Sequence, residues 1–221
     1  MSIRTLLQRL IGRTENNRDF FGRVFEKNAW GGIFSRSGTG SEGQPAKQKV
    51  EVLTDLLNRY GIRTVLDIGC GDFYWMRELV DRVDCYLGLD IVPRLVENNR
   101  ARYGSEKVDF RDLDLTRETI DPIGDERRWD LVVCVDVIGH LSNAEVSSLL
   151  RALVRDLNFR YLLLTNRRDA QSLLYLTREK TRHEGIDVEK HPVFLEAKFV
   201  KLLEVPALYP GDTFNLYKKE F

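Results

Sequence analysis

The sequence has no apolar run long enough to cross a membrane. A transmembrane helix needs about 18 or more consecutive apolar residues, and no segment of the 221 residues approaches that length. Apolar residues between positions 2 and 11 recur at helical spacing, but they lack the unbroken apolar core and the cleavage site of a signal peptide. We expect a protein without a membrane span, although a basic amphipathic helix of this kind can also lie on a membrane surface.

Cysteine is scarce, and net charge is absent. The three cysteines, Cys70, Cys85 and Cys134, show neither the spacing of a zinc site nor a disulfide pattern, which favours the reducing environment of the cytoplasm. Lys plus Arg and Asp plus Glu both number 34. This balance argues against a nucleic-acid partner held by phosphate neutralisation. The length suffices for one sizeable domain with a buried core.

The glycine triplet of a dinucleotide site is also incomplete. A predicted strand over 64–68 contains Asp67 and runs into Gly69-Cys70-Gly71, but no third glycine follows within G-x-G-x-x-G spacing. Asp72 would moreover repel a pyrophosphate at this turn. Both features disfavour a nicotinamide oxidoreductase and favour a cofactor with an adenosine but no phosphate, such as S-adenosylmethionine.

A second acid completes a nucleotide-site layout. Asp90 ends a second predicted strand, 85–90, and lies 23 residues after Asp67. A strand, a glycine turn, a helix, a second strand and an acid follow one another as in Rossmann-type sites, where the second acid binds ribose hydroxyls.

With this layout in place, the sequence resembles the class I S-adenosylmethionine-dependent methyltransferases in four ordered segments: 65–72, 87–91, 108–115 and 129–141. The resemblance covers roughly residues 60–165 and implies S-adenosylmethionine as cofactor. The cofactor-binding residues that we expect are Asp67, Gly69, Cys70, Gly71, Asp90, Ile91, Asp114, Leu115 and Val135.

Two positions within these segments carry specific expectations. We expect Asp114, rather than Asp112, to meet the adenine amino group, because Asp112 stays within the third strand. Phe73 stands where many members of the family have a third glycine, which should alter the methionine end of the pocket.

The alternation of strand and helix patterns predicts an α/β fold. We expect a doubly wound, mostly parallel seven-stranded sheet with a C-terminal antiparallel strand pair and an N-terminal helical and lid extension. Residues 1–45 would form the helical segment and a Gly/Ser-rich lid loop, and residues 46–221 the cofactor-binding domain. The predicted strands are 64–68, 85–90, 108–113, 131–135, 161–165, 199–205 and 213–219, and the predicted helices after residue 45 are 46–60, 74–80, 93–103 and 143–157.

Candidate catalytic residues follow the fourth and fifth strands, because reactive groups gather at the carboxyl ends of parallel strands. His140 could act as general base or merely pack at a helix start. Asp136 could orient His140, act as the base itself, or meet the cofactor's amine. Asn166 is a candidate substrate-binding residue. With Asp112 and Asp136 it could also form a magnesium site, but a second acid directly after the fifth strand is missing, so no metal is expected.

The segment 30–41 is a candidate lid over the methyl acceptor. It combines Trp30, Arg36 and Thr39 with several glycines. Trp30 could stack on a ring, and Arg36 could bind a carboxylate or phosphate. The alternative is a flexible surface linker, although linkers rarely contain Trp, Ile and Phe within five residues.

These observations indicate a methyltransferase for a small-molecule acceptor. O-methylation of a sugar, a glycan end or a nucleotide-linked sugar is the favoured reaction, and the oligomeric state is left open. A protein or RNA methyltransferase is one alternative, although the Asn-Pro-Pro-Tyr type of loop used for base nitrogens is absent. A cofactor-binding partner subunit without catalytic activity is another.

Overall fold

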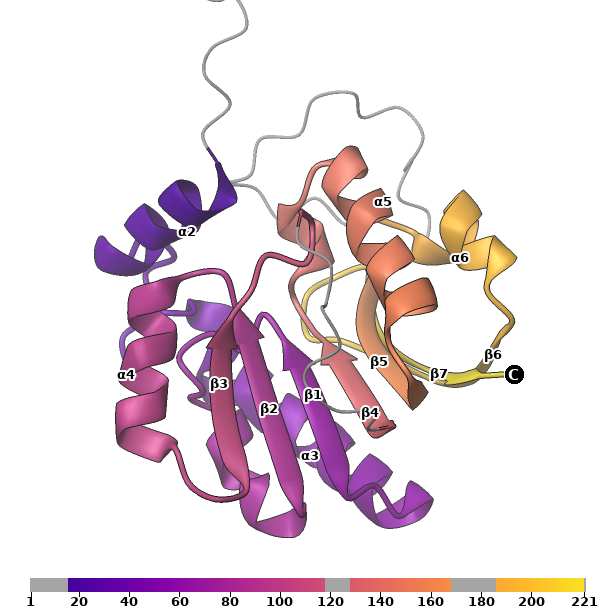
Figure 1. Cartoon of the computed structure of the whole chain (residues 1–221), viewed down its shortest axis with the longest axis horizontal. Helices are drawn as coiled ribbons and strands as arrows, with labels where there is room; N and C mark the ends of the chain where they lie inside the picture. The colour runs from indigo at the N-terminus through magenta and orange to yellow at the C-terminus, as the bar shows by residue number, and fades with distance from the viewer. Residues whose placement is uncertain (1–15, 118–127, 168–185, 221) are drawn as a thin grey trace, which may run out of the picture.

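The computed structural model describes residues 16–117, 128–167 and 186–220, which include one seven-stranded sheet (Figure 1). The strand order is β3-β2-β1-β4-β5-β7-β6. The first five strands are parallel, whereas β7 runs antiparallel to both β5 and β6. The predicted doubly wound sheet with a closing antiparallel pair is confirmed. The strands are β1 Thr64–Ile68, β2 Cys85–Asp90, β3 Val108–Asp112, β4 Trp129–Cys134, β5 Phe159–Arg167, β6 Phe199–Pro206 and β7 Asp212–Lys219.

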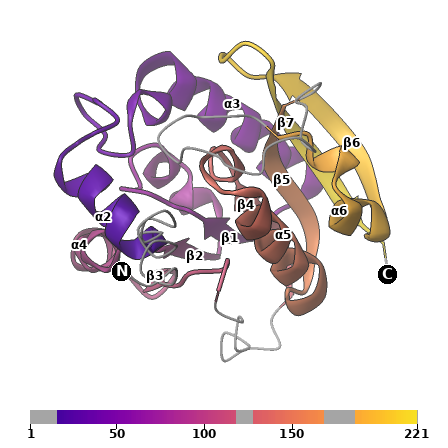
Figure 2. The ribbon, with the colours of Figure 1, turned by 90° about the horizontal axis from the view of Figure 1, so that it is seen from above.

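Helices cover both faces of the sheet. Figure 2 shows α3 and α5 on opposite sides of the central strands. The sequence dictates this arrangement because successive strand residues point to opposite faces: Val65 belongs to the core that includes Leu53 and Leu56 of α3, and Leu66 to the core that includes Leu149 of α5. The helices are α2 Asn17–Glu26, α3 Gly43–Tyr60, α4 Pro93–Tyr103, α5 Asn143–Arg151 and α6 Pro192–Glu196.

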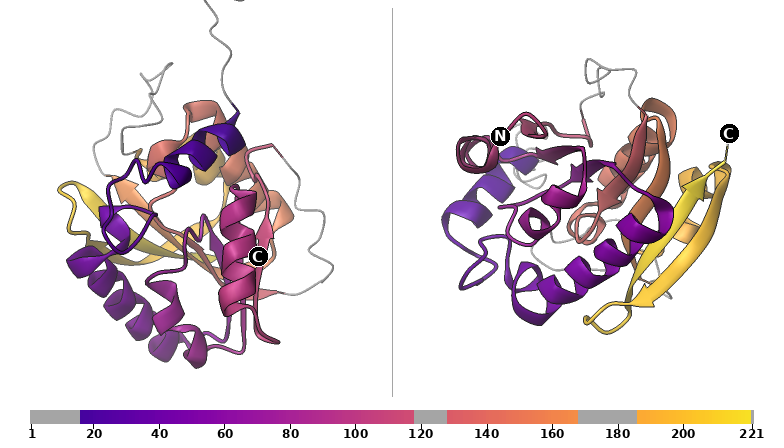
Figure 3. Two further views of the ribbon diagram at one scale, coloured as in Figure 1. Left: turned by 90° about the vertical axis from the view of Figure 1, so that its left-hand side faces the viewer. Right: turned by 90° about the horizontal axis from the view of Figure 1, so that it is seen from below.

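The chain reverses its direction of winding between β1 and β4. β1 pairs with β2 on one side and with β4 on the other, so the connections leave these strands toward opposite faces. A crevice opens at the carboxyl ends of strands at such a point. α2 lies on this side of the sheet, and the β6–β7 pair forms the edge opposite to β3 (Figures 1 and 3).

The predicted helix over 74–80 is wrong. The structure has two short 3-10 turns there, Met76–Glu78 and Val80–Arg82. The reason lies at Phe73, which has a φ of 62° and is 1% exposed. Its ring packs against three aromatic rings at centroid distances of 4.9–5.3 Å. This anchor turns the chain into the core immediately after the glycine turn.

The other predicted helix boundaries differ less from those in the structure. α3 begins three residues before the predicted start and ends at Gly61, whose φ of 59° suits a glycine helix cap. α2 confirms a helix before residue 28, whereas the helix expected over 2–11 lies outside the described residues. None of the helices within 16–117, 128–167 and 186–220 is both long and apolar enough for a bilayer crossing.

Candidate functional site

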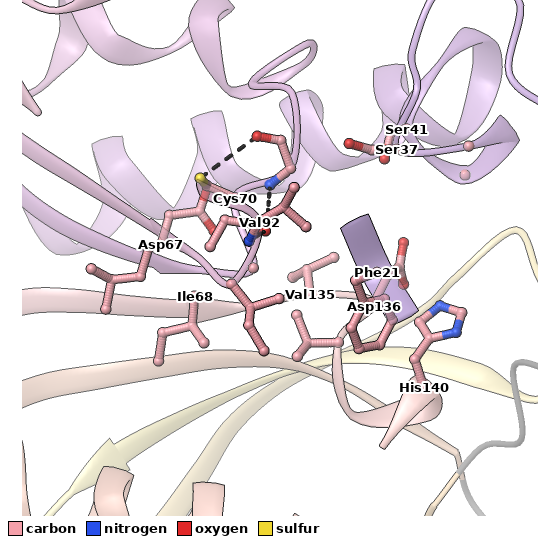
Figure 4. A pocket seen from close by; sticks show the side chains of 18 of the residues that line it. Phe21, Ser37, Ser41, Asp67, Ile68, Cys70, Val92, Val135, Asp136 and His140 are labelled. Atoms are coloured by element: carbon pink, nitrogen blue, oxygen red, sulfur yellow. Dashed lines mark hydrogen bonds between the residues drawn. The ribbon is translucent and has the colours of Figure 1, made fainter. Parts of the chain in front are cut away.

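A cavity of about 460 Å³ lies at the carboxyl ends of β1, β2 and β4. Its walls come from α2, the segment 30–41, the Gly69–Gly71 turn and the residues that follow β2, β3 and β4. Figure 4 shows side chains from these elements around one space. The cavity therefore occupies the place where doubly wound sheets bind their ligands.

The glycine turn brings bare backbone to this wall. Gly69 and Gly71 have backbone φ values of 71° and 55°, which residues other than glycine rarely adopt. A Cβ at Gly69 would collide with Val137, and one at Gly71 would collide with the Ser37 side chain. Both glycines are thus required by backbone conformation and by close neighbours, and the bare backbone between them faces the cavity.

Asp90 lies across the turn at the end of β2. Its Oδ2 accepts the Gly71 N–H and its Oδ1 accepts the Val92 N–H, each at 3.0 Å. Burial raises the pKa of this carboxyl, and the backbone N–H groups oppose the rise. Each carboxylate oxygen has a further lone pair, so two ribose hydroxyls can still bind. Asp90 lines the cavity at the position expected for that role.

Asp114 and Asp112 occupy different surroundings. Asp114 is 4% exposed, lines the cavity, and accepts from the Thr116 N–H and hydroxyl at 3.0 and 2.6 Å. The Asp112 side chain is 51% exposed, forms an ion pair with Arg18 at 2.9 Å and is not part of the cavity wall. Asp112 therefore ends β3 and Asp114 lies beyond it at the cavity, whereas the contact of Asp114 with adenine stays a prediction.

The adenine assignment gives a paired test. Asp114→Asn should weaken binding of S-adenosylhomocysteine by about tenfold or more, because it removes a charged acceptor from the expected adenine site. Asp112→Asn should leave the affinity unchanged within about threefold, since Asp112 lies outside the cavity. Titration calorimetry measures both affinities. A larger loss of affinity in Asp112→Asn than in Asp114→Asn would show that the adenine assignment is wrong.

Asp67 lies beneath the cavity and is 3% exposed. Burial raises the pKa of its carboxyl to about 7, and a hydrogen bond donated by the Tyr86 hydroxyl at 2.8 Å opposes the rise. Asp67 is thus a buried acid that changes charge near neutral pH.

A change in stability with pH follows from the raised pKa of Asp67. Between the ordinary value of 3.8 and the folded value of about 7, the folded protein binds the proton more tightly than the unfolded chain does. Stability should therefore fall as pH rises through this window and level off above it. Asp67→Asn should remove the fall and stabilise the protein at about pH 8 by up to ~4 kcal/mol. Urea unfolding at about pH 5 and about pH 8 tests this, and an equal effect at both pH values would contradict it.

The other predicted cofactor residues also line the cavity, namely Cys70, Ile91, Leu115 and Val135. Cys70 is 7% exposed and burial raises the pKa of its thiol, so it contributes apolar surface rather than a reactive thiolate. The expectation for Phe73 is wrong, because its ring lies in the core and is not part of the cavity wall.

The segment 30–41 is an anchored part of the wall. The Asp72 carboxylate accepts from the Ser35 hydroxyl, the Arg36 N–H and the Ser37 hydroxyl at 2.9, 2.7 and 3.1 Å. Glu42 accepts three successive N–H groups, of residues 33–35, at 2.6–3.0 Å. The segment thus lines the cavity and is held by Asp72 and Glu42, and its movement as a lid stays a prediction. Asp72 fastens it to the glycine turn.

The three predicted substrate residues of this segment all line the cavity. The Trp30 ring lies 5.2 Å from the His140 ring. The Arg36 guanidinium donates to carbonyls at the end of α2, at 3.2 and 3.3 Å. The Thr39 hydroxyl lies 3.4 Å from the hydroxyl of Tyr209, which comes from the β6–β7 turn. The wall segment and the β6–β7 turn, which are far apart in the sequence, therefore meet at the cavity.

Asp136 and His140 lie at one end of the cavity (Figure 4). Asp136 lies two residues after the end of β4 and has a φ of 59°. Its N–H donates to the Thr165 hydroxyl at 2.9 Å, and that hydroxyl lies 3.1 Å from the Asp136 Oδ1. His140 ends a 3-10 turn, Ile138–His140, rather than a turn of α-helix.

Lys49 is the site residue that sequence reasoning missed. Its Nζ lies 2.5 Å from the Asp136 Oδ2, and its side chain is 5% exposed. The signal was available, because Lys49 falls on the apolar face of α3 between Ala46 and Leu53. A lysine at that spacing has either to extend past the core or to meet a buried acceptor.

The assignment of Asn166 to the substrate requires a correction. Asn166 is 1% exposed and is not part of the cavity wall. Its amide donates to Asp187 at 3.2 Å and accepts the Val188 N–H at 2.8 Å, so it holds the segment 186–188. β5 continues to Arg167, and side chains alternate along a strand. Arg167, not Asn166, lines the cavity.

Among the residues that the structure describes, Asp112, Asp136 and Asn166 do not form a magnesium site. Within the described part of the chain, no three His, Cys, Asp or Glu side chains are grouped closely enough to hold an ion. Asp112 points to an ion pair outside the cavity, and the Asn166 amide is engaged elsewhere.

Comparisons with known proteins find a methyltransferase domain in the central part of the chain. Residues 65–158 match a family model described as a methyltransferase domain. The small RNA 2'-O-methyltransferase of Rattus norvegicus is 30% identical over 111 residues, which cover 46% of this chain and 28% of the rat protein. The matched region of the chain thus spans little more than a quarter of that relative's length.

Two solved structures share the fold. N-methyltransferase NodS from Bradyrhizobium japonicum, in complex with S-adenosylhomocysteine, has a TM-score of 0.67 at 15% identity over 90% of this chain and 98% of that one. Magnesium protoporphyrin IX methyltransferase from Synechocystis, with the same ligand bound, has a TM-score of 0.62 at 18% identity over 92% and 98%. The family match over residues 65–158, the strand order and the glycine turn at the switch point together support a class I S-adenosylmethionine-dependent methyltransferase domain, with S-adenosylmethionine as the cofactor.

Proposed function

We propose that this enzyme transfers a methyl group to a hydroxyl oxygen of a small sugar-containing acceptor: a sugar, a glycan end or a nucleotide-linked sugar. The observation that carries the proposal is the set of groups at one end of the cavity. Asp136, His140 and Trp30 supply an oriented carboxylate, a candidate base and a ring that can lie against a sugar.

The other end of the cavity suits the cofactor. Asp90 and Asp114 present carboxylates for ribose hydroxyls and an adenine amino group, and the bare turn between Gly69 and Gly71 admits a chain close to the backbone. Bound there, S-adenosylmethionine would supply a methyl group on a positively charged sulfur. The roles of these residues toward the cofactor are part of the proposal.

His140 is the base that we favour. Asp136 already accepts from the Lys49 ammonium and the Thr165 hydroxyl, and these contacts stabilise its charged form. His140 lies at the same end and can take the proton of an acceptor hydroxyl near neutral pH. The wall formed by Trp30, Thr39 and Tyr209 restricts water and positions the acceptor.

RNA is the second candidate acceptor. The curated relatives are small RNA 2'-O-methyltransferases, and a ribose 2'-hydroxyl is also a hydroxyl of a sugar. The chemistry at Asp136 and His140 would be the same, and the difference would lie in what binds outside the cavity. The balance of 34 basic and 34 acidic residues favours the small acceptor.

A transfer assay separates these candidates. The enzyme is incubated with methyl-labelled S-adenosylmethionine and, in separate reactions, free sugars, oligosaccharides, nucleotide sugars, short RNA and a protein mixture. Label on a sugar oxygen of a small acceptor supports the proposal. Label in RNA alone or in protein alone overturns it in favour of the corresponding alternative. Tight binding of S-adenosylhomocysteine without transfer to any acceptor overturns it in favour of a subunit without catalytic activity.

A further inference from the structure

We propose that Lys49 is a positioning residue for methyl transfer: its ammonium fixes the Asp136 carboxylate and the wall segment 30–41 in one arrangement around the acceptor. The inference rests on the proposed function for its catalytic consequence. Its structural consequence, the coupling of the wall to the end of β4, can be measured without an acceptor.

Burial of the Lys49 ammonium is unfavourable in itself. The Lys49 side chain is 5% exposed, and moving an ammonium from water into a protein interior is unfavourable unless acceptors replace the lost water. Here Nζ donates to the Asp136 Oδ2 at 2.5 Å and to the Gly40 carbonyl at 2.9 Å, and it lies 5.6 Å from the Trp75 ring centroid. An apolar side chain would fill the same place on α3 without these requirements, so packing alone does not explain a lysine.

The two groups that accept hydrogen bonds from the Lys49 ammonium belong to different parts of the fold. Gly40 is part of the wall segment, and Asp136 follows β4. Lys49, from α3, therefore bridges the wall segment and the residues that follow β4, beside the cavity. A Cβ at Gly40 would lie 3.6 Å from the Asp136 Oδ2 and 3.4 Å from the Tyr209 hydroxyl, which shows how closely these elements approach.

Asp136 has a backbone conformation and a carboxylate orientation that its neighbours enforce. Its φ of 59° is unusual for a residue with a side chain and persists only where neighbours enforce it. Thr165 binds its N–H and faces Oδ1, while Lys49 binds Oδ2. The carboxylate is thus oriented from two sides at the acceptor end, and Lys49 provides the charged contact of the two.

The wall has a separate anchor at the cofactor end. Asp72 binds residues 35–37 next to the glycine turn, whereas Lys49 binds residue 40. Loss of the ammonium should therefore loosen the wall and the carboxylate at the acceptor end and leave the glycine turn in place. Cofactor affinity and acceptor turnover should respond differently.

The test compares Lys49→Met with Lys49→Arg, and uses Lys47→Met as control. Lys47 lies on the same helix with its side chain 67% exposed. Methionine keeps the length without the charge, and arginine keeps the charge. For each variant the readouts are thermal unfolding, amide exchange of residues 37–41, affinity for S-adenosylhomocysteine, and kcat and KM for the acceptor that the wild type methylates.

In Lys49→Met, exchange of these amides should rise at least about tenfold, and S-adenosylhomocysteine affinity should stay within about threefold. Its kcat should fall at least about tenfold with a smaller change in KM. Lys49→Arg should recover most of both losses, and Lys47→Met should match the wild type.

Unchanged exchange in a folded Lys49→Met protein would overturn the proposal, as would lost cofactor affinity with unchanged kcat. If Lys49→Met does not fold, Lys49→Arg decides: near wild-type kcat and exchange support positioning by charge, and a large loss of kcat with normal folding contradicts it. If the wild type methylates no acceptor in the assay above, the proposed function fails, but amide exchange still decides whether Lys49 holds the wall.

Discussion

Asp90→Ala is expected to weaken binding of S-adenosylhomocysteine by at least about tenfold, and by up to several hundredfold. A bond from a hydroxyl to a carboxylate contributes roughly 1.5 to 3 kcal/mol, and about 1.4 kcal/mol corresponds to a factor of ten in affinity. Asp90 also holds the turn through the Gly71 and Val92 N–H groups. Its removal therefore loses both a ligand contact and the organisation of the turn.

Asp84→Ala is the matched control, because Asp84 directly precedes β2, at the opposite end from Asp90, with its side chain 62% exposed. Asp90→Asn separates the two contributions of Asp90, since the amide can still accept one N–H but lacks the charge. Calorimetry should rank the affinities as wild type and Asp84→Ala, then Asp90→Asn, then Asp90→Ala. Unchanged affinity in folded Asp90→Ala would remove Asp90 from the cofactor site.

His140→Ala should lower the turnover rate by at least about 10²-fold while S-adenosylhomocysteine affinity stays within about threefold. A positioned base typically contributes about 10²-fold to 10⁴-fold, and His140 lies at the end of the cavity away from Asp90 and Asp114. Single-turnover rates with an acceptor that the wild type methylates, together with calorimetry, measure the two effects separately.

The control for His140→Ala is His191→Ala. His191 caps α6, and its ring nitrogen lies 3.0 Å from the Ser147 hydroxyl, outside the cavity wall. Its turnover should match the wild type. Loss of cofactor binding in His140→Ala would show that His140 supports the structure of the site, and full turnover would transfer the role of base to Asp136 or show that orientation alone suffices.

The parts of the fold that the sequence predicted are those with strong local signals. β1 and β2 are short apolar runs that end at a glycine turn and at an acid, and the positions of Asp90, Asp114 and the glycine turn follow from counting along the chain. These features depend on neighbours within a few residues, so one sequence suffices to predict them.

The errors arose where distant residues decide the local structure. Phe73 turns inward because Tyr86, Tyr103 and Phe110 form a pocket for its ring, and this interaction replaced the predicted helix. Asn166 failed as a substrate residue because β5 extends to Arg167. A shift of one residue along a strand exchanges the two faces.

Lys49 was not predicted because functional residues were expected at the carboxyl ends of the strands, whereas Lys49 comes from a helix. Only the fold shows that α3 passes beside the end of β4 and that the wall segment closes over both. A lysine on an otherwise apolar helix face is a signal that can be read from sequence, but its partner cannot.

The proposed roles of Asp90, Asp114 and His140 require one orientation of the cofactor in the cavity, and a crystal structure with S-adenosylhomocysteine tests this orientation most directly. We expect the ribose hydroxyls within hydrogen-bonding distance of Asp90, the adenine amino group at Asp114, and the sulfur facing the end of the cavity formed by Asp136, His140 and Trp30. An adenosine bound away from Asp90 and Asp114, or a sulfur directed away from Asp136 and His140, would contradict the account.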